Sequence, residues 1–282
     1  MESDTRSLSS PYDRLHIYYL QGRADTRSAG FDNRFIGNWE EDDTSFLFFS
    51  EDATPEVEAF VVCRPELTLV DHFSMAYDEW QPIDHFPITS GGFSIHPAWN
   101  SPAPDTSGRA IVLDPGVVFG SGCHATTSDC LEALDLAWQR RGGRLQSVLD
   151  LGTGTGLLAV AAARLGALRV IGVDINFLAA STALRNAALN HVQDRVLIVK
   201  GDARSFAGMP ADLLMANIHY DIMRHVLASP AFLKCRAFIL SGLLRTPARE
   251  VFDQLKKLPV NLIKQWNSDG IWYTFLGEVN SQ

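Results

Sequence analysis

Short apolar runs alternate with longer amphipathic stretches over the second half of the chain. Runs typical of buried strands occupy residues 148–150, 169–175, 195–200, 211–218 and 237–244. Helical periodicity marks residues 128–139, 157–164, 177–190, 221–233 and 247–258. Two further strands, near 260–266 and 271–279, follow each other without a helix between them. Because strands that alternate with helices form parallel sheets, the pattern predicts an α/β fold with a Rossmann-like, mostly parallel seven-stranded sheet and an antiparallel edge.

The N-terminal part of the chain carries a different pattern. Apolar runs at residues 15–20, 45–49 and 59–63 resemble strands between turns, and a short helix near 55–58 is weakly signalled. Residues 97–109 are rich in Pro, Ser and Gly, which is typical of a loop. The sequence therefore predicts a small N-terminal α+β domain at residues 1–75, a linker at 76–108 and a larger domain at 109–282.

The segment VLDLGTGTG, residues 148–156, joins the end of an apolar run to closely spaced glycines. Gly152, Gly154 and Gly156 follow the carboxylate of Asp150 and predict a tight turn that a ligand can approach. The G-x-G-x-G spacing differs from the G-x-G-x-x-G of nicotinamide and flavin enzymes, which disfavours a nicotinamide oxidoreductase. S-adenosylmethionine has a cationic sulfonium and no pyrophosphate, so it suits such a turn beside a carboxylate. A generic strand-to-helix turn is the alternative reading of these glycines.

Polar residues follow four successive predicted strands, as Asp150, Asp174, Asp202 and Asn217. Asp174 lies 22 residues after Gly152, where a carboxylate holds the ribose hydroxyls of a nucleotide, although a helix N-cap is an alternative role. Asp202 is expected either to meet an adenine amino group or to cap a turn. Because ligands of parallel sheets bind at the carboxyl ends of the strands, the four residues predict one cofactor site.

Composition narrows the class of protein further. The 282 residues are 46% hydrophobic, which supports sizeable cores, and no run reaches the roughly 18 apolar residues of a membrane span. The N-terminus has no apolar segment of the secretory type, and four cysteines contain no C-x-x-C pair. We therefore expect a cytoplasmic protein with reduced thiols and no metal site.

Charge is divided unevenly along the chain. Residues 1–108 carry 19 acidic and 6 basic side chains, a net charge of −13, and residues 109–282 carry 14 acidic and 18 basic ones, a net charge of +4. The two parts add to the −9 of the whole chain. An acidic N-terminal part disfavours nucleic-acid binding and would steer a basic protein substrate. An acidic, solvated surface without a partner is the plainer alternative.

The segment DPGVVFGSGCHATT, residues 114–127, combines many glycines with a Phe, a His and paired threonines, as in a loop that covers a site. It resembles the D-P-G-x-A-F-G-T-G-x-H-x-T-T signature of the bacterial ribosomal protein L-11 lysine methyltransferases, the PrmA family. Further similar motifs are DEW at 78–80, IHPAW at 95–99, GNWE at 37–40, NI at 217–218, LSGL at 240–243 and GIWY at 270–273.

This resemblance implies a class I methyltransferase fold with S-adenosylmethionine as the cofactor. It assigns cofactor binding to Thr127, Gly152, Asp174 and Asn217, and the glycine turn adds Gly154. The implied substrate is a lysine of ribosomal protein L-11 or of another lysine-bearing protein, with no membrane partner. The resemblance also implies a ferredoxin-like N-terminal domain that recognises the ribosomal protein.

Asn217 is the candidate residue for positioning the acceptor amine, because its side-chain oxygen would accept a hydrogen bond from the amine. The residues after it read Ile-His-Tyr instead of the Pro-Pro-Tyr expected for a planar amide nitrogen, which favours an aliphatic amine. The chain departs from the family pattern at Val118, Ser121, Asn176, His219 and Tyr220. Residues whose roles stay open are Phe119, His124, His219 and Tyr220.

Two other functions remain compatible with these residues. The chain either methylates a small-molecule amine, or binds the cofactor without turnover as an assembly factor. The acidic N-terminal part argues mildly against the first, and the complete set of Gly152, Asp174 and Asn217 argues against the second.

Overall fold

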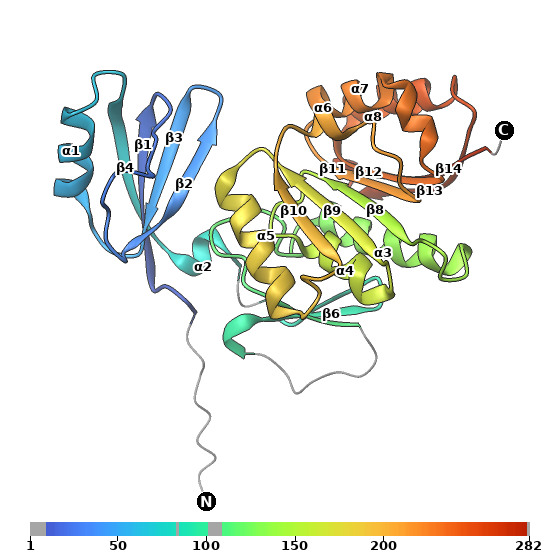
Figure 1. Cartoon of the computed structure of the whole chain (residues 1–282), viewed down its shortest axis with the longest axis horizontal. Helices are drawn as coiled ribbons and strands as arrows, with labels where there is room; N and C mark the ends of the chain where they lie inside the picture. The colour runs from blue at the N-terminus through green and yellow to red at the C-terminus, as the bar shows by residue number, and fades with distance from the viewer. Residues whose placement is uncertain (1–9, 83–84, 101–108, 281–282) are drawn as a thin grey trace, which may run out of the picture. The chain divides into compact units, whose positions relative to one another are not determined.

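The computed structural model describes residues 10–82, 85–100 and 109–280. Contacts divide the chain into two units (Figure 1). The first comprises residues up to 84 together with 176–178, and the second comprises 85–175 and 179–282. Within the described residues, none of the helices combines the length and apolar character needed to cross a membrane.

The first unit is an antiparallel sheet with a helix on one face. Its elements are β1 (Arg14–Gln21), β2 (Phe35–Glu41), β3 (Thr44–Phe49), α1 (Thr54–Val62), β4 (Thr68–Ala76) and α2 (Tyr77–Trp80). The strand order is β2-β3-β1-β4, and all neighbours are antiparallel. Side chains of β1 and β3, including Tyr18 and Phe49, pack against Val57 and Phe60 of α1 to form its core.

The prediction of a strand at residues 59–63 is wrong, because these residues complete helix α1 and the turn after it. Pro55 occupies the first turn of this helix, where a missing N–H costs nothing. Val57 and Phe60, three residues apart, are both buried, whereas Val62 is 84% exposed. This spacing places one face of a helix against the sheet, although the run of apolar residues at 59–63 by itself resembles a strand. Strand β2 and the mostly exposed edge strand β4 are not predicted by the sequence pattern.

The strand order of this unit is that of a ferredoxin-like βαββαβ sheet, but one helix is missing. Residues 22–34, which connect β1 to β2, form turns and no helix. Here Asp25 accepts a hydrogen bond from the backbone N–H of Arg27, and Asp32 accepts one from that of Arg34. Such local side-chain bonds compete with helix formation. The ferredoxin-like expectation therefore needs correction at this crossover.

The second unit contains the predicted sheet. Its strands are β8 (Ser147–Leu151), β9 (Arg169–Asp174), β10 (Val196–Lys200), β11 (Leu213–Asn217), β12 (Ala237–Leu244), β13 (Val260–Ser268) and β14 (Trp272–Val279). Their order is β10-β9-β8-β11-β12-β14-β13. The pairs among the first five are parallel, whereas β14 is antiparallel to both β12 and β13. The mostly parallel sheet with an antiparallel edge is confirmed.

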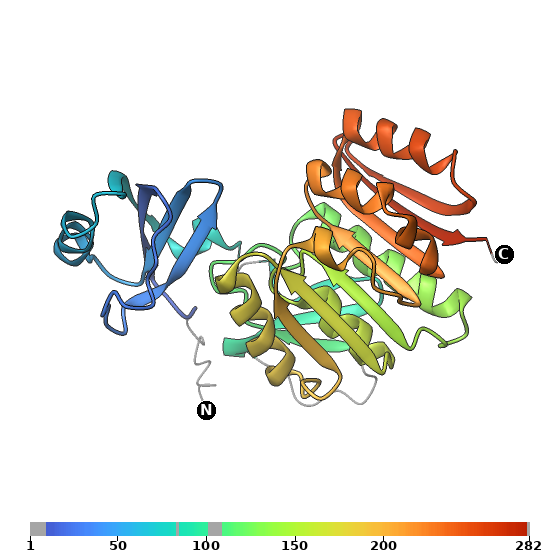
Figure 2. The ribbon, with the colours of Figure 1, turned by 45° about the horizontal axis from the view of Figure 1, so that its top comes forward.

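Helices cover both faces of this sheet (Figure 2). They are α3 (Ala125–Arg140), α4 (Leu157–Leu165), α5 (Phe177–Leu189), α6 (Ala203–Phe206), α7 (Tyr220–Ala228) and α8 (Arg245–Leu255), with short 3-10 turns η2 (Ala98–Asn100) and η3 (Pro230–Lys234). One apolar cluster joins α3 and α4 to the sheet, and a second joins α7 and α8 to it. There are two clusters because successive side chains of each strand point to opposite faces of the sheet, and helices cover both faces.

The predicted linker at 76–108 contains more ordered structure than a linker requires. Strands β5 (Ile88–Ser90) and β6 (Phe93–Pro97) form a small sheet with β7 (Ala110–Leu113). Phe93 and Ile95 are fully buried in the same apolar cluster as α3 and α4. Burial of these two side chains ties the segment to the second unit. Residues 101–108 of the predicted linker lie outside the described residues.

Candidate cofactor-binding and active site

The turn between β8 and α4 allows the backbone to come unusually close to its neighbours. Gly152, Gly154 and Gly156 have φ angles of +72°, +55° and +81°, which favour glycine. A Cβ on Gly152 would lie 2.3 Å from Ile218 Cγ2, and one on Gly154 would lie 2.6 Å from the Phe119 oxygen. The three glycines are therefore required by the fold itself, and the turn presents bare backbone at the strand ends.

The glycine-rich segment 114–124 lies directly against this turn. The backbone N–H of Thr155 donates to the Phe119 oxygen at 3.2 Å, and Thr155 Oγ1 donates to the Gly120 oxygen at 2.7 Å. Asn186 of α5 joins the two segments, because its Nδ2 contacts both the Asp114 oxygen at 2.9 Å and the Thr155 oxygen at 2.8 Å. Segments far apart in the sequence thus form one surface.

Asp174 lies at the end of β9, beside the glycine turn. Its Oδ2 accepts a hydrogen bond from the Gly154 N–H at 2.9 Å. The half-buried carboxylate therefore belongs to the same surface as the turn. Asp202 differs: it caps α6 and accepts from the Arg204 backbone N–H, and the Arg204 guanidinium beside it lowers its pKa. Of the two roles predicted for Asp202, the structure shows the cap.

Thr127 is buried in the first turn of α3, and its hydroxyl has no hydrogen-bond partner among the residues that the structure describes. A buried polar atom without a partner costs free energy unless something binds it. The neighbouring Thr126 connects α3 to the sheet, because Asn217 Nδ2 donates to Thr126 Oγ1 at 3.3 Å. The structure thus places Thr127 and Asn217 on two elements, α3 and β11, that this hydrogen bond joins.

A hydrogen-bond chain fixes the orientation of the Asn217 amide. His124 caps α3: its Nδ1 lies 3.3 Å from the Thr126 N–H that donates to it and 2.8 Å from Thr126 Oγ1. An accepting Nδ1 requires an unprotonated nitrogen, and burial lowers the pKa of His124. The Thr126 hydroxyl therefore donates to His124 and accepts from Asn217 Nδ2. The Asn217 Oδ1 is then the atom that would accept a hydrogen bond from a ligand.

Sequence reasoning missed Thr126 and the aromatic residue Trp272 of β14. The Phe119 and Trp272 rings each meet the His124 ring edge-on, with centroids 5.3 and 5.0 Å away. Phe119 is 54% exposed, so this row of rings borders the site at the surface. The paired threonines of the 114–127 motif were the available signal for Thr126.

His219 and Tyr220 lie on the rim and not among the residues above. The exposed His219 caps α7 by accepting from the Asp221 N–H, and the Tyr220 hydroxyl donates to Glu250 of α8. Hydrogen bonding to Glu250 raises the pKa of Tyr220. Both contacts are structural ones within α7 and α8.

Asp150 is buried beneath the turn. Burial raises the pKa of its carboxyl to about 7, and Thr153 Oγ1 donates to it at 2.6 Å. The side chain therefore supports the turn from below, although the sequence placed it with the strand-end residues that meet the cofactor.

A profile of the family described as "Ribosomal protein L11 methyltransferase (PrmA)" matches residues 38–279. The chain belongs to this family. It is 29% identical over 272 residues to the ribosomal protein L11 methyltransferase of Staphylococcus haemolyticus, an alignment that covers 95% of this chain and 80% of that protein. It is 37% identical over 205 residues to the corresponding protein of Syntrophotalea carbinolica, covering 71% of this chain and 64% of that protein.

A solved structure supports the same assignment to the PrmA family. The crystal structure of the ribosomal protein L11 methylase from Lactobacillus delbrueckii subsp. bulgaricus matches with a TM-score of 0.55 and 26% identity. The match covers 67% of this chain and 94% of that one. The fold is therefore that of a class I methyltransferase, and S-adenosylmethionine is the cofactor of a PrmA family member. The bare turn, the Asp174 carboxylate and the unpartnered Thr127 hydroxyl fit such a cationic, hydrogen-bonding group.

Replacing Thr127 with valine tests whether its hydroxyl binds the cofactor. Valine keeps the shape and removes an unpaired buried hydroxyl, so the free energy of unfolding without cofactor should stay equal or rise by about 1 kcal/mol. The affinity for S-adenosylmethionine should fall about tenfold, measured by isothermal titration calorimetry.

The matched control for this variant is Thr182→Val, because the buried Thr182 hydroxyl accepts from Arg185. That variant should lose stability and keep its affinity. Unchanged cofactor affinity in Thr127→Val would contradict the role of the Thr127 hydroxyl.

The raised pKa of Asp150 predicts a pH-dependent stability. An unfolded aspartate titrates near pH 4, so between about pH 4 and 7 the folded chain holds a proton that the unfolded chain has released. The contribution of Asp150 to stability therefore falls as the pH rises through this window and is lowest above it. Asp150→Asn, which keeps an oxygen for Thr153, should gain roughly 1–4 kcal/mol more over wild type at pH 8 than at pH 5.

Urea denaturation at the two pH values measures this difference. The exposed Asp253→Asn serves as the control and should show no such difference. An equal effect of Asp150→Asn at both pH values would show that the buried carboxyl does not titrate in this range.

Proposed function

We propose that this protein transfers methyl groups from S-adenosylmethionine to lysine side chains of ribosomal protein L11. The observation that carries the proposal is the family match over residues 38–279, which takes in the glycine turn, Asp174 and Asn217 together. The relatives named above are ribosomal protein L11 methyltransferases, and this substrate is transferred to the chain from them. A cytoplasmic location, where ribosomal proteins are made, is part of the proposal.

The chemistry requires a neutral amine at the site. Bound S-adenosylmethionine supplies an electrophilic methyl group on a cationic sulfonium. Removing a proton from a lysine at pH 7 costs roughly 4–5 kcal/mol, given a reference pKa near 10.4. A desolvated site lowers that cost by depressing the lysine pKa. The rings of Phe119 and Trp272, both in contact with His124, supply apolar surface that a bound lysine side chain would cover.

Asn217 positions the acceptor amine in this proposal. Its Nδ2 is engaged by Thr126, so its Oδ1 is set to accept a hydrogen bond from the incoming nitrogen. A hydrogen bond from the amine to Oδ1 orients the nitrogen lone pair toward the methyl group. Such alignment is the main catalytic contribution of an enzyme that uses neither a metal nor a covalent intermediate.

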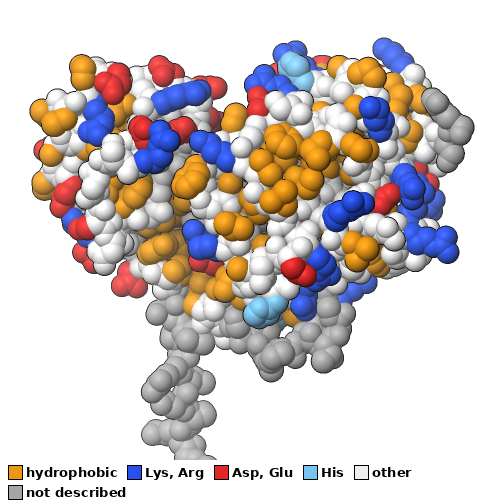
Figure 3. Space-filling model, in the orientation of Figure 1, with side chains coloured by type: hydrophobic (Ala, Val, Ile, Leu, Met, Phe, Trp, Pro, Cys, Tyr) orange, Lys and Arg blue, Asp and Glu red, His pale blue; other side chains and the backbone are white. Residues whose placement is uncertain are grey.

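The first unit serves as the recognition domain for the protein substrate. Its β2–β3 hairpin carries exposed acidic residues at its tip, including Glu41, Asp42 and Asp43. Figure 3 shows acidic side chains spread over the surface of this unit. An acidic surface attracts a basic ribosomal protein over about the Debye length and speeds its encounter with the enzyme.

Label transfer tests the proposed activity. The purified protein, radiolabelled S-adenosylmethionine and ribosomal proteins from a strain lacking this gene should give label on L11 at lysine residues, identified by mass spectrometry. Asn217→Ala should lower kcat about 100-fold through lost alignment. The exposed Asn261→Ala, on the strand β13, is the control and should retain full activity.

The possible outcomes separate the alternatives. Label on another protein or on a small amine would keep the methyltransferase and exclude L11 as its target. Tight cofactor binding without any transfer would favour the non-catalytic assembly factor.

Neutralising the hairpin tests the recognition domain. Glu41→Gln combined with Asp42→Asn should raise the KM for the protein substrate about 3- to 10-fold at low salt and leave the cofactor affinity unchanged. Asn suits position 42, where φ is +49°. The same charge change at the exposed Asp194 and Asp253 is the matched control. An equal rise in KM from both pairs would mean that net charge, and not the hairpin, sets the encounter.

A further inference from the structure

Three side chains that can bind metal converge on the helix-bearing face of the first unit. His16 of β1 lies two residues before Tyr18, and Tyr18 is paired in register with His72 of β4. Side chains two apart on a strand share a face, so the two imidazoles are diagonal neighbours. Asp52, which follows β3 and precedes α1, completes the group. One ligand atom from each residue lies within 4.8 Å of the other two.

The spacing of the two histidines matches that of ligands on one tetrahedral metal ion. His16 Nδ1 and His72 Nε2 are 3.3 Å apart. Two nitrogens each about 2.05 Å from a tetrahedral ion are separated by about 3.3 Å. The same separation also permits a hydrogen bond between the two rings, and the convergence of the Asp52 carboxylate with both imidazoles is what points to an ion.

We propose that His16, His72 and Asp52 bind a divalent transition metal of the zinc class, with water as the fourth ligand. Two imidazoles and a carboxylate are the donors that zinc prefers, whereas calcium and magnesium take oxygen ligands. The sequence gives no sign of this site, since its ligands come from three distant segments and no short motif joins them.

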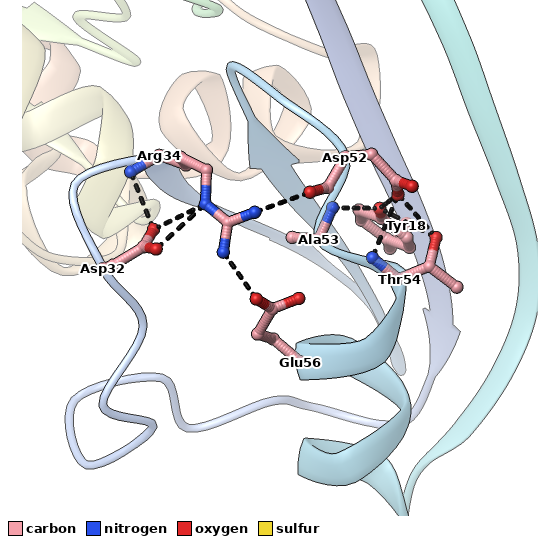
Figure 4. A network of polar contacts seen from close by, with 7 residues as sticks. All are labelled: Tyr18, Asp32, Arg34, Asp52, Ala53, Thr54 and Glu56. Atoms are coloured by element: carbon pink, nitrogen blue, oxygen red, sulfur yellow. Dashed lines mark hydrogen bonds and ion pairs between the residues drawn. The ribbon is translucent and has the colours of Figure 1, made fainter.

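Neighbouring residues hold two of the ligands in place. The Tyr18 hydroxyl, the Thr54 hydroxyl and the Thr54 N–H all donate to Asp52 Oδ1, at 2.8, 2.7 and 3.0 Å (Figure 4). These bonds keep the carboxylate ionised and lower the pKa of Asp52, and a metal would take Oδ2. The His72 ring stacks on the Tyr18 ring with centroids 4.2 Å apart and planes 6° apart. Supporting contacts of this kind orient metal ligands in known sites.

The accessibility and charge of the cluster also suit an ion from solution. His72 and Asp52 are exposed, and His16 is half-buried. Glu51 adds a negative charge nearby, and Arg14 adds a positive one. Bound metal would join β1, β4 and the start of α1, and would stabilise the folded unit because the unfolded chain does not hold the three ligands together.

Metal titration of the full-length protein without a histidine tag tests the proposal. After treatment with a chelator, the protein should take up one Zn²⁺ per chain against a chromophoric competitor. Co²⁺ should give the intense visible absorption of a tetrahedral site. His72→Gln and, separately, Asp52→Asn should abolish the stoichiometric uptake and the cobalt band.

Two matched variants serve as controls. His191→Asn removes an exposed histidine of the second unit, where φ is +55° and asparagine fits, and should bind as wild type does. Cys63→Ser removes an exposed thiol of the first unit and should also leave uptake unchanged.

A thermal melt with chelator present separates loss of the site from loss of the fold. His72→Gln should melt as wild type does there, and only wild type should gain stability when Zn²⁺ is added. If His72→Gln fails to fold, His16→Gln takes its place in the same titration. Absent uptake by wild type, or equal uptake by the variants, would show a plain histidine pair and overturn the proposal. This test is independent of the methyltransferase activity, since its readout is metal binding alone.

Discussion

The candidate site depends on the contact between the glycine turn and the backbone of residues 119–120. Thr155 donates from both its N–H and its hydroxyl to this stretch, and Gly154 lies so close to the Phe119 oxygen that no side chain fits between them. A segment fixed here reaches its helix N-cap at His124 only a few residues later. The start of α3, and with it Thr126 and Thr127, is thereby set above the strand ends. The constraint explains why glycines occur on both sides of the contact.

A buried polar network also holds α3 against strands β12, β13 and β14. Asp129 accepts hydrogen bonds from Ser268 of β13 and from Thr274 of β14, each at 3.2 Å. The Thr274 hydroxyl lies 2.6 Å from that of Ser241 on β12. Burial raises the pKa of Asp129, so the group is retained at an energetic cost that its partners offset only in part. Networks of this kind specify one geometry, and here they hold the helix that carries the Asn217 contact. The antiparallel strands β13 and β14 therefore contribute to the site indirectly, because they hold the position of α3.

The seven-stranded sheet of the second unit was predictable because its parallel strands are short apolar runs with clear ends, whereas β5, β6 and β7 of the same unit were not predicted. The first unit was less so. Residues 59–63 are apolar throughout. Only the burial of Val57 and Phe60 against the sheet in the folded chain distinguishes a helix from a strand here. The exposed strand β4 shows no alternation to detect. At the site, the glycines and Asp174 stand in local motifs, whereas the bond from Asn217 to Thr126 spans 91 residues of sequence and becomes visible only in the folded chain.

Asn176, one of the five departures from the family pattern, accepts a hydrogen bond from the Leu178 N–H at the start of α5, and the other four fall into two groups by position. Val118 is fully buried and Ser121 nearly so, which means that these two changes alter packing inside the 114–124 segment. His219 and Tyr220 lie on the rim, where they cap α7 and contact Glu250. None of the four removes a partner of the glycine turn, Asp174 or Asn217. The structure therefore accounts for His219 and Tyr220 by contacts within α7 and α8, and the residues of the glycine turn keep their partners.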